Sequence, residues 1–414
     1  MERTIFFIIV GIVVLDFLVE RILDALNAVR VNTSLPERFK GFYDEQKYKQ
    51  SQEYKKVKDQ FGLLVSTLSF LALIALLWFE GFAWLDEFWR QYTSNEILLS
   101  LLFFGSLGLV ADLLSTPFAY YNTFVIEDRF GFNKMDIKTF ITDKLKGWLL
   151  GVVIGGGLLA LIVWFYQAAG DYFWLIAWIV ITLFSIFMTM FYSTLIVPLF
   201  NKQTPLEDGP LREEIENFAK KAGFKLDNIF VINGSKRSAK SNAYFSGLGP
   251  KKRIVLFDTL IENHSKEELV AVLAHEIGHY KKKHTLLNVI LSVVQTGILL
   301  YVLSLFIDNP LMSGALGADQ PSFHMGVLAF SLLFTPINFI LGFLMNKLSR
   351  KFEYQADEFA GKQYSAEALK TALKKLSADN LSNLHPHPAY VSVYYSHPPV
   401  MQRLEYLDQF EKTD

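Results

Sequence analysis

The stretch that decides the fold is SKEELVAVLAHEIGHYKKKHTLLNVILSVVQTGILLYVLSLFI, residues 265–307. Ser265 and Glu268 form a capping box, which predicts that a helix begins there. Residues 285–307 are apolar for long enough to cross a bilayer, which takes about 20 helical residues. The stretch therefore predicts a helix that carries His275-Glu276-Ile277-Gly278-His279 and runs toward a membrane span.

The composition is that of a membrane protein. Of 414 residues, 51% are apolar and 15% aromatic, and the mean hydropathy is +0.26. The net charge of −1 gives no reason to expect nucleic acid as a partner. The chain has no cysteine, so any bound metal must be held by histidine, aspartate or glutamate.

Further apolar segments resemble residues 285–307, and together they predict seven transmembrane helices. The first segment has no small-residue cleavage site after it, so we expect it to be retained rather than removed as a signal peptide. The seven segments are 5–23, 61–79, 97–117, 147–167, 173–200, 285–307 and 325–345.

The loops alternate in charge. Loop 24–60 carries eight lysines and arginines and loop 119–146 carries five. The loop after the second segment has only Arg90, and the loops after the fourth and sixth segments have neither residue type. Basic loops stay in the cytosol, so the N-terminus is expected outside and the C-terminus inside. The predicted domains are five spans with cytosolic loops (1–200), a first catalytic part (201–284), spans six and seven (285–345) and a second catalytic part (346–414).

The two catalytic parts are predicted to form a small α+β domain on the cytosolic side. Residues 210–221 follow a helical pattern, and residues 228–233 and 253–257 follow β-like patterns. Residues 241–247 alternate like an edge strand. The predicted fold class is thus mostly α, a polytopic membrane protein with this domain attached.

The His-Glu motif has the spacing of a zinc peptidase site. His275 and His279 lie one helical turn apart, so both imidazoles can reach one metal ion. Glu276 can take a proton from an activated water. A catalytic zinc site needs a third protein ligand, and Glu353 is the best candidate. Asp357, on the same helix face, can orient a liganding imidazole; a solvent-facing acidic pair is the alternative.

The sequence resembles the integral-membrane CAAX prenyl endopeptidases, a family of seven-span zinc peptidases. The resemblance covers nearly the whole chain and rests on five boxes in the family's order. They are residues 127–134 (EDRFGFNK), 234–238 with 241–244 (GSKRS and SNAY), 275–279 (HEIGH), 353–357 (EYQAD), and His397-Pro398-Pro399 followed by Arg403.

The resemblance implies one Zn²⁺ per chain, held by His275, His279 and Glu353. It implies that the spans enclose a chamber, and that a peptide or prenylated-peptide substrate adds as a strand beside Asn242-Ala243-Tyr244. Asn242 and His397 match positions thought to steady the oxyanion. Arg403 is expected to pair with a carboxylate near the site.

Several other polar residues are separate from these boxes. Asp16, Glu20 and Asp112 lie within predicted spans, where ionisable groups mostly face a cavity or a partner. We expect a cavity for Asp112, whereas Asp16 and Glu20 fit a cavity or the headgroup region equally well. His264, His284 and His324 flank spans or helices and are expected to take no part in the site.

Two other functions fit parts of the pattern. A quality-control peptidase of the heat-shock membrane type would share the chemistry and differ in substrate. A transporter with an accidental His-Glu motif would show repeated halves, and the sequence has no such repeat. The membrane is expected to be a bacterial inner (plasma) membrane or the ER membrane, with the site facing the cytosol. The sequence leaves the oligomeric state open.

Overall fold

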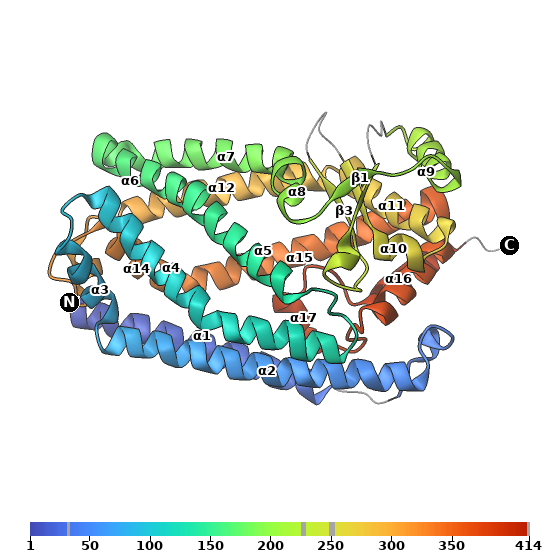
Figure 1. The fold of residues 1–414 in the computed structure, drawn as a ribbon, viewed down its shortest axis with the longest axis horizontal. Helices are drawn as coiled ribbons and strands as arrows, with labels where there is room; N and C mark the ends of the chain where they lie inside the picture. The colour runs from blue at the N-terminus through green and yellow to red at the C-terminus, as the bar shows by residue number, and fades with distance from the viewer. Residues whose placement is uncertain (31–33, 225–228, 248–252, 412–414) are drawn as a thin grey trace.

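The computed structural model describes residues 1–30, 34–224, 229–247 and 253–411. Long helices run along most of the molecule, and a small sheet with shorter helices lies at one end (Figure 1). The long part contains α1 (Glu2–Val29), α2 (Glu45–Trp78), α3 (Gly81–Arg90), α4 (Glu96–Tyr121), α5 (Ile137–Leu150), α6 (Gly157–Ala169), α7 (Phe173–Leu195), α8 (Val197–Phe200), α12 (His284–Ser304), α13 (Pro310–Gly314), α14 (Phe323–Leu333) and α15 (Thr335–Ala360).

Four helical runs of the described residues are long and apolar enough to cross a membrane, or five if α14 and α15 form one bent span. One run, Ile137–Phe200, contains two of the predicted segments, because the chain turns back at Gly170 (φ +52°) and α6 packs against α7. The predicted first segment lies in α1. This helix is continuous, but charged residues such as Asp16 interrupt its apolar sequence. Seven spans therefore remain a prediction.

The last predicted span is bent. Residues 325–345 extend over α14 and the start of α15, whose axes differ by 57°. Pro336 stands in the first turn of α15. Its ring removes a backbone donor and clashes with the preceding turn, so a straight helix cannot continue through it.

The end of the molecule with the shorter helices holds, within the described residues, a four-stranded sheet of order β1-β2-β4-β3. β2 (Ile229–Ile232) runs parallel to β4 (Arg253–Phe257), and β3 (Ala243–Ser246) is antiparallel to β4 at the edge. The three predicted strands thus form, with Asn228 outside the described residues. The short β1 (Gln203–Pro205) was not predicted, because three residues carry no readable alternation.

The remaining α-helices are α9 (Pro210–Lys221), α10 (Asp258–Asn263), α11 (Lys266–Lys281), α16 (Ala366–Asp379), α17 (Pro388–Tyr394) and α18 (Val400–Leu407). Of these, α10 and α11 pack against the sheet, whereas α17 packs against α15 and α1. The predicted capping box begins α11, since Ser265 and Glu268 each bond the other's backbone N–H. Most of α11 is buried. A Cβ on Gly278 would come within 3.1 Å of Ala356 Cα, so glycine lets α11 and α15 touch there.

The predicted helix through the His-Glu motif forms as α11 and runs toward the sixth predicted span, but it ends before that span begins. Lys283 adopts a left-handed conformation (φ +61°), which ends α11 and lets α12 begin at His284. This break turns the His284 side chain back toward α11, where it contacts His279.

Candidate metal centre

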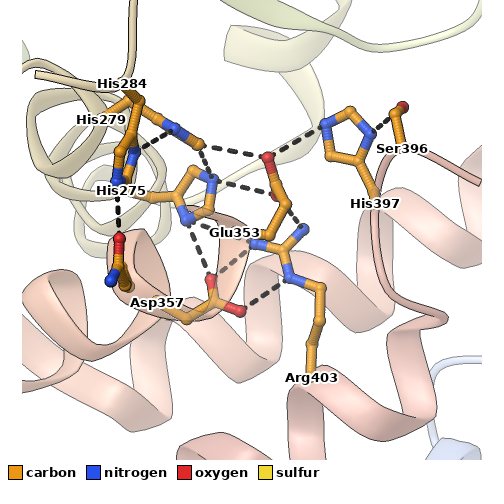
Figure 2. Close-up of polar contacts among 9 residues, drawn as sticks. His275, His279, His284, Glu353, Asp357, Ser396, His397 and Arg403 are labelled. Atoms are coloured by element: carbon orange, nitrogen blue, oxygen red, sulfur yellow. Dashed lines mark hydrogen bonds and ion pairs between the residues drawn. The ribbon is translucent and has the colours of Figure 1, made fainter. Parts of the chain in front are cut away.

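Three predicted ligands converge between α11 and α15. His275 Nε2 lies 3.1 Å from His279 Nε2, and the Glu353 carboxylate oxygens lie 3.4 Å from the first nitrogen and 3.2 Å from the second. Figure 2 shows both imidazoles turned toward this carboxylate. The side chains are largely buried, and they form the group of described residues that could hold a metal ion.

The donor set fits zinc. Ligand atoms about 2.0–2.2 Å from one tetrahedral zinc ion are separated from one another by roughly 3.3–3.6 Å, close to the three separations observed. Glu353 Oε2 is buried and accepts no short hydrogen bond from the described residues, since its nearest donors, His275 Nε2 and Arg403 Nη1, lie 3.4 and 3.5 Å away. A buried carboxylate oxygen without a hydrogen bond is costly, so this atom is ready to bind a cation.

His275 is oriented by a buried ion pair. Its Nδ1 lies 2.8 Å from Asp357 Oδ1, so the Nδ1–H can donate there and leave Nε2 free to ligate. Arg403 donates to both Asp357 oxygens, at 2.8 and 2.6 Å. Burial and the Arg403 charge lower the pKa of His275, but the Asp357 and Glu353 carboxylates outweigh them and raise it to about 9 in the metal-free protein. A metal ion bound at Nε2 would displace the proton from that nitrogen.

His279 is oriented by a histidine that was expected to take no part. His284 Nδ1 lies 3.0 Å from His279 Nδ1, and its Nε2 lies 2.8 Å from Gln355 Oε1. Because the Gln355 oxygen accepts from Nε2, the neutral His284 ring presents Nδ1 as an acceptor to His279. The expectation is therefore wrong for His284, since only the break at Lys283 brings it back to the site.

Glu276 borders the same space. It lines a cavity of about 420 Å³ together with His275, His279 and Glu353. Burial raises the pKa of Glu276, although His275 and His279 act to lower it. A carboxylate with a raised pKa is better suited to accept a proton near neutral pH.

The predicted substrate-facing residues border this cavity as well. Ala243 and Tyr244 line it from β3, Asn242 from the residue just before β3, and His397 from the segment before α18. Asn242 Oδ1 accepts from the Ala243 N–H at 2.9 Å, which leaves its Nδ2 group as the donor. His397 is 64% exposed at its side chain, and its Nε2 lies 3.3 Å from Glu353 Oε1.

Three of the other polar residues singled out by the sequence have partners outside this cavity. Lys144 Nζ donates to Asp112 at 2.8 Å, so Asp112 has a cationic partner. Glu20 pairs with Arg21. His324 is buried, with its Nε2 2.6 Å from Asp86 Oδ1.

Known proteins resemble the chain over its whole length. Residues 25–202 match the family described as the CAAX prenyl protease N-terminal part with five membrane helices, and residues 205–411 match peptidase family M48. A CAAX prenyl protease 1 homolog of Arabidopsis thaliana is 36% identical over 98% of both chains. CAAX prenyl protease 1 of Saccharomyces cerevisiae is 36% identical over 91% of this chain and 89% of that one.

The same likeness holds in three dimensions. The crystal structure of S. mikatae Ste24p superposes with a TM-score of 0.93 at 33% identity, covering 98% of this chain and 99% of that one. Both parts of the sequence and the fold thus resemble those of CAAX prenyl proteases. The chain belongs to the CAAX prenyl protease family, and its C-terminal part belongs to peptidase family M48.

Proposed function

We propose that the chain is a membrane-embedded zinc endopeptidase that hydrolyses peptide bonds near the C-terminus of prenylated or membrane-delivered substrates. The observation that carries this proposal is the convergence of His275, His279 and Glu353 beside Glu276, in a cavity bordered by an edge strand. The names of the relatives, CAAX prenyl proteases, support the substrate class.

Each residue of the site has a separate role in the proposed hydrolysis. When held by His275, His279 and Glu353, a zinc ion would polarise the scissile carbonyl and acidify a water molecule. Glu276 accepts a proton from the water whose oxygen attacks the carbonyl carbon, and it passes this proton to the amine that leaves when the C–N bond breaks. Asn242 and His397 donate hydrogen bonds to the oxyanion that develops on the carbonyl oxygen.

The substrate is held as an extended peptide. Among the described residues, β3 pairs with β4 on one side only, and an unpaired strand edge can bind a peptide through main-chain hydrogen bonds. Ala243 and Tyr244 lie in this strand and line the cavity. The substrate carbonyl would thus be brought to Glu276 and the metal ligands.

We propose that seven transmembrane helices enclose a chamber and that the chain divides at the predicted domain limits. In this arrangement the two catalytic parts, residues 201–284 and 346–414, lie in the cytosol. The basic loops 24–60 and 119–146 support this orientation. Only 6–17% of the residues in the apolar windows of the span candidates are buried inside the protein. Such low burial supports helices that face lipid on one side and a hollow interior on the other.

A farnesylated CAAX peptide tests the proposal. The purified protein, in detergent with zinc, is incubated with the peptide, and cleavage is followed by mass spectrometry. We expect wild type to release the last three residues. Glu276→Ala should keep its metal and lose turnover by about 100-fold or more, because the ligands remain and the base is gone.

The outcomes separate chemistry from substrate. Full zinc with undiminished cleavage in Glu276→Ala would remove Glu276 from the mechanism. Zinc bound at one per chain without cleavage by wild type would contradict the CAAX substrate and favour a quality-control peptidase for damaged membrane proteins.

A further inference from the structure

The segment before β3 is anchored to the membrane part through an ionic cluster that the mechanism does not use. We call Tyr54, Lys58, Glu127 and Lys240 the strand anchor. Lys240 Nζ donates to Glu127 Oε2 and to the Tyr54 hydroxyl oxygen, in both cases at 2.9 Å. Glu127 Oε1 accepts from Tyr54 at 2.7 Å and from Lys58 at 3.2 Å.

Backbone hydrogen bonds beside the cluster join the same two segments. The Lys134 N–H donates to Arg237 O at 3.1 Å, and the Ala239 N–H donates to Phe132 O at 2.9 Å. Lys240 Nζ also lies 4.4 Å from the Phe132 ring centroid, a favourable cation–π distance. The box at residues 127–134 thus holds residues 237–240 by main chain and side chain together.

Glu127 lies beside packed aromatic side chains. It ends a π-helical segment, η2 (Asn122–Glu127), a rare conformation that is frequent at functional sites. Phe130 and Phe132 are buried and each packs edge-on against Tyr54. The Glu127 side chain is 15% exposed and that of Lys240 35%, so water only partly weakens their attraction.

The anchor lies immediately before the substrate strand. Lys240 precedes Asn242 by two residues, and its carbonyl accepts from Thr259 Oγ1 at 3.0 Å. Ser241 exchanges hydrogen bonds with Asn380 at the end of α16. Because β4 is the one strand that pairs with β3 in the described part of the chain, the position of the first residues of β3 depends on these contacts.

We infer that Glu127 and Lys240 are positioning residues that set the edge strand β3 for substrate. This inference rests on the proposed function, since it assigns a role in substrate capture. Strand pairing binds the ground state and the transition state alike, so loosening the strand should raise KM more than it lowers kcat. The metal ligands are carried by α11 and α15, so metal content should not change.

The test compares Glu127→Gln, Lys240→Met and the double variant. We expect each single variant to raise KM for the farnesylated peptide about tenfold, the scale of one charge-assisted hydrogen bond. The double variant should be no worse than either single one, because both remove the same contact. Hydrogen exchange of the Ala243–Ser246 amides, which needs no activity, should become faster in all three.

The matched control is Arg129→Gln. Arg129 belongs to the same box but pairs at the surface with Glu53, where both side chains are more than half exposed. KM and strand exchange should stay within about twofold of wild type, because exposed pairs contribute little. The inference is overturned if Glu127→Gln behaves like this control, or if the anchor variants lose metal, which would indicate a general structural effect.

The two proposals fail in different ways. If wild type cleaves no farnesylated peptide, the proposed substrate fails, and strand exchange still tests the anchor. If wild type cleaves and the anchor variants show faster exchange with an unchanged KM, the inference alone is overturned.

Discussion

Replacing Arg403 by methionine should destabilise the protein by leaving Asp357 buried without its partner. The guanidinium donates to both carboxylate oxygens, at 2.8 and 2.6 Å, and the exposed fractions of the two side chains are 11% and 0%. Breaking such a buried pair by removing one partner costs about 3–5 kcal/mol, because an uncompensated charge remains.

The same change should weaken metal binding. Asp357 Oδ1 lies 2.8 Å from His275 Nδ1, and Arg403 holds that carboxylate in place. Without the guanidinium, the carboxylate can take up a proton or turn away, and the imidazole loses its fixed orientation. Losing a group that orients a metal ligand typically lowers metal affinity about 10–100-fold.

The assay measures zinc affinity by competition with a chelator, and thermal unfolding in detergent, for wild type, Arg403→Met, Asp357→Leu and the double variant. The double variant should lose less stability than the sum of the single losses, by about 1–3 kcal/mol, because it buries no unpaired charge. Arg212→Met is the control, since it removes ion pairs with the exposed Glu216 and Asp208 and one hydrogen bond to the Leu206 carbonyl. This change should cost about 1 kcal/mol, and it leaves no carboxylate buried.

The reasoning is refuted if Arg403→Met matches Arg212→Met in both measurements. It is equally refuted if the losses of the two single variants simply add in the double variant, since the pair would then not act as a unit.

Three further predictions follow from other contacts. Glu353→Ala should lose stoichiometric zinc, measured by elemental analysis, and full retention would exclude Glu353 as a ligand. His284→Phe can keep the ring stacking on Phe352 but loses the contact with His279, so zinc affinity should fall about 10–100-fold; wild-type affinity would make that contact dispensable. Burial lowers the pKa of His264 in the folded protein from 6.5. As the pH falls below 6.5, His264 therefore takes up a proton in the unfolded chain before it does so in the folded protein, and the free energy of unfolding decreases until the pH reaches the lowered pKa. His264→Gln should reduce this acid-induced drop in the thermal midpoint, and an equal drop in both proteins would contradict the reasoning.

Much of the local structure follows from the sequence, because it depends on neighbouring residues. The capping box of Ser265 and Glu268 begins α11, and the helical pattern of residues 210–221 forms α9. Alternation in residues 241–247 corresponds to the edge strand β3. Helical spacing also puts His275 and His279 on one face. Caps and periodicity act over a few residues, so a single segment is enough to read them.

Only the tertiary structure decided how distant segments meet. Glu353 reaches the two histidines because Gly278 lets α11 approach Ala356 of α15. His284 enters the site because Lys283 takes a left-handed turn, and Glu127 meets Lys240 across 113 positions of sequence. Such contacts depend on packing and on single backbone angles, which no local pattern encodes. The sequence alone determined the residue types of the predicted ligands, and the fold determined which groups orient them.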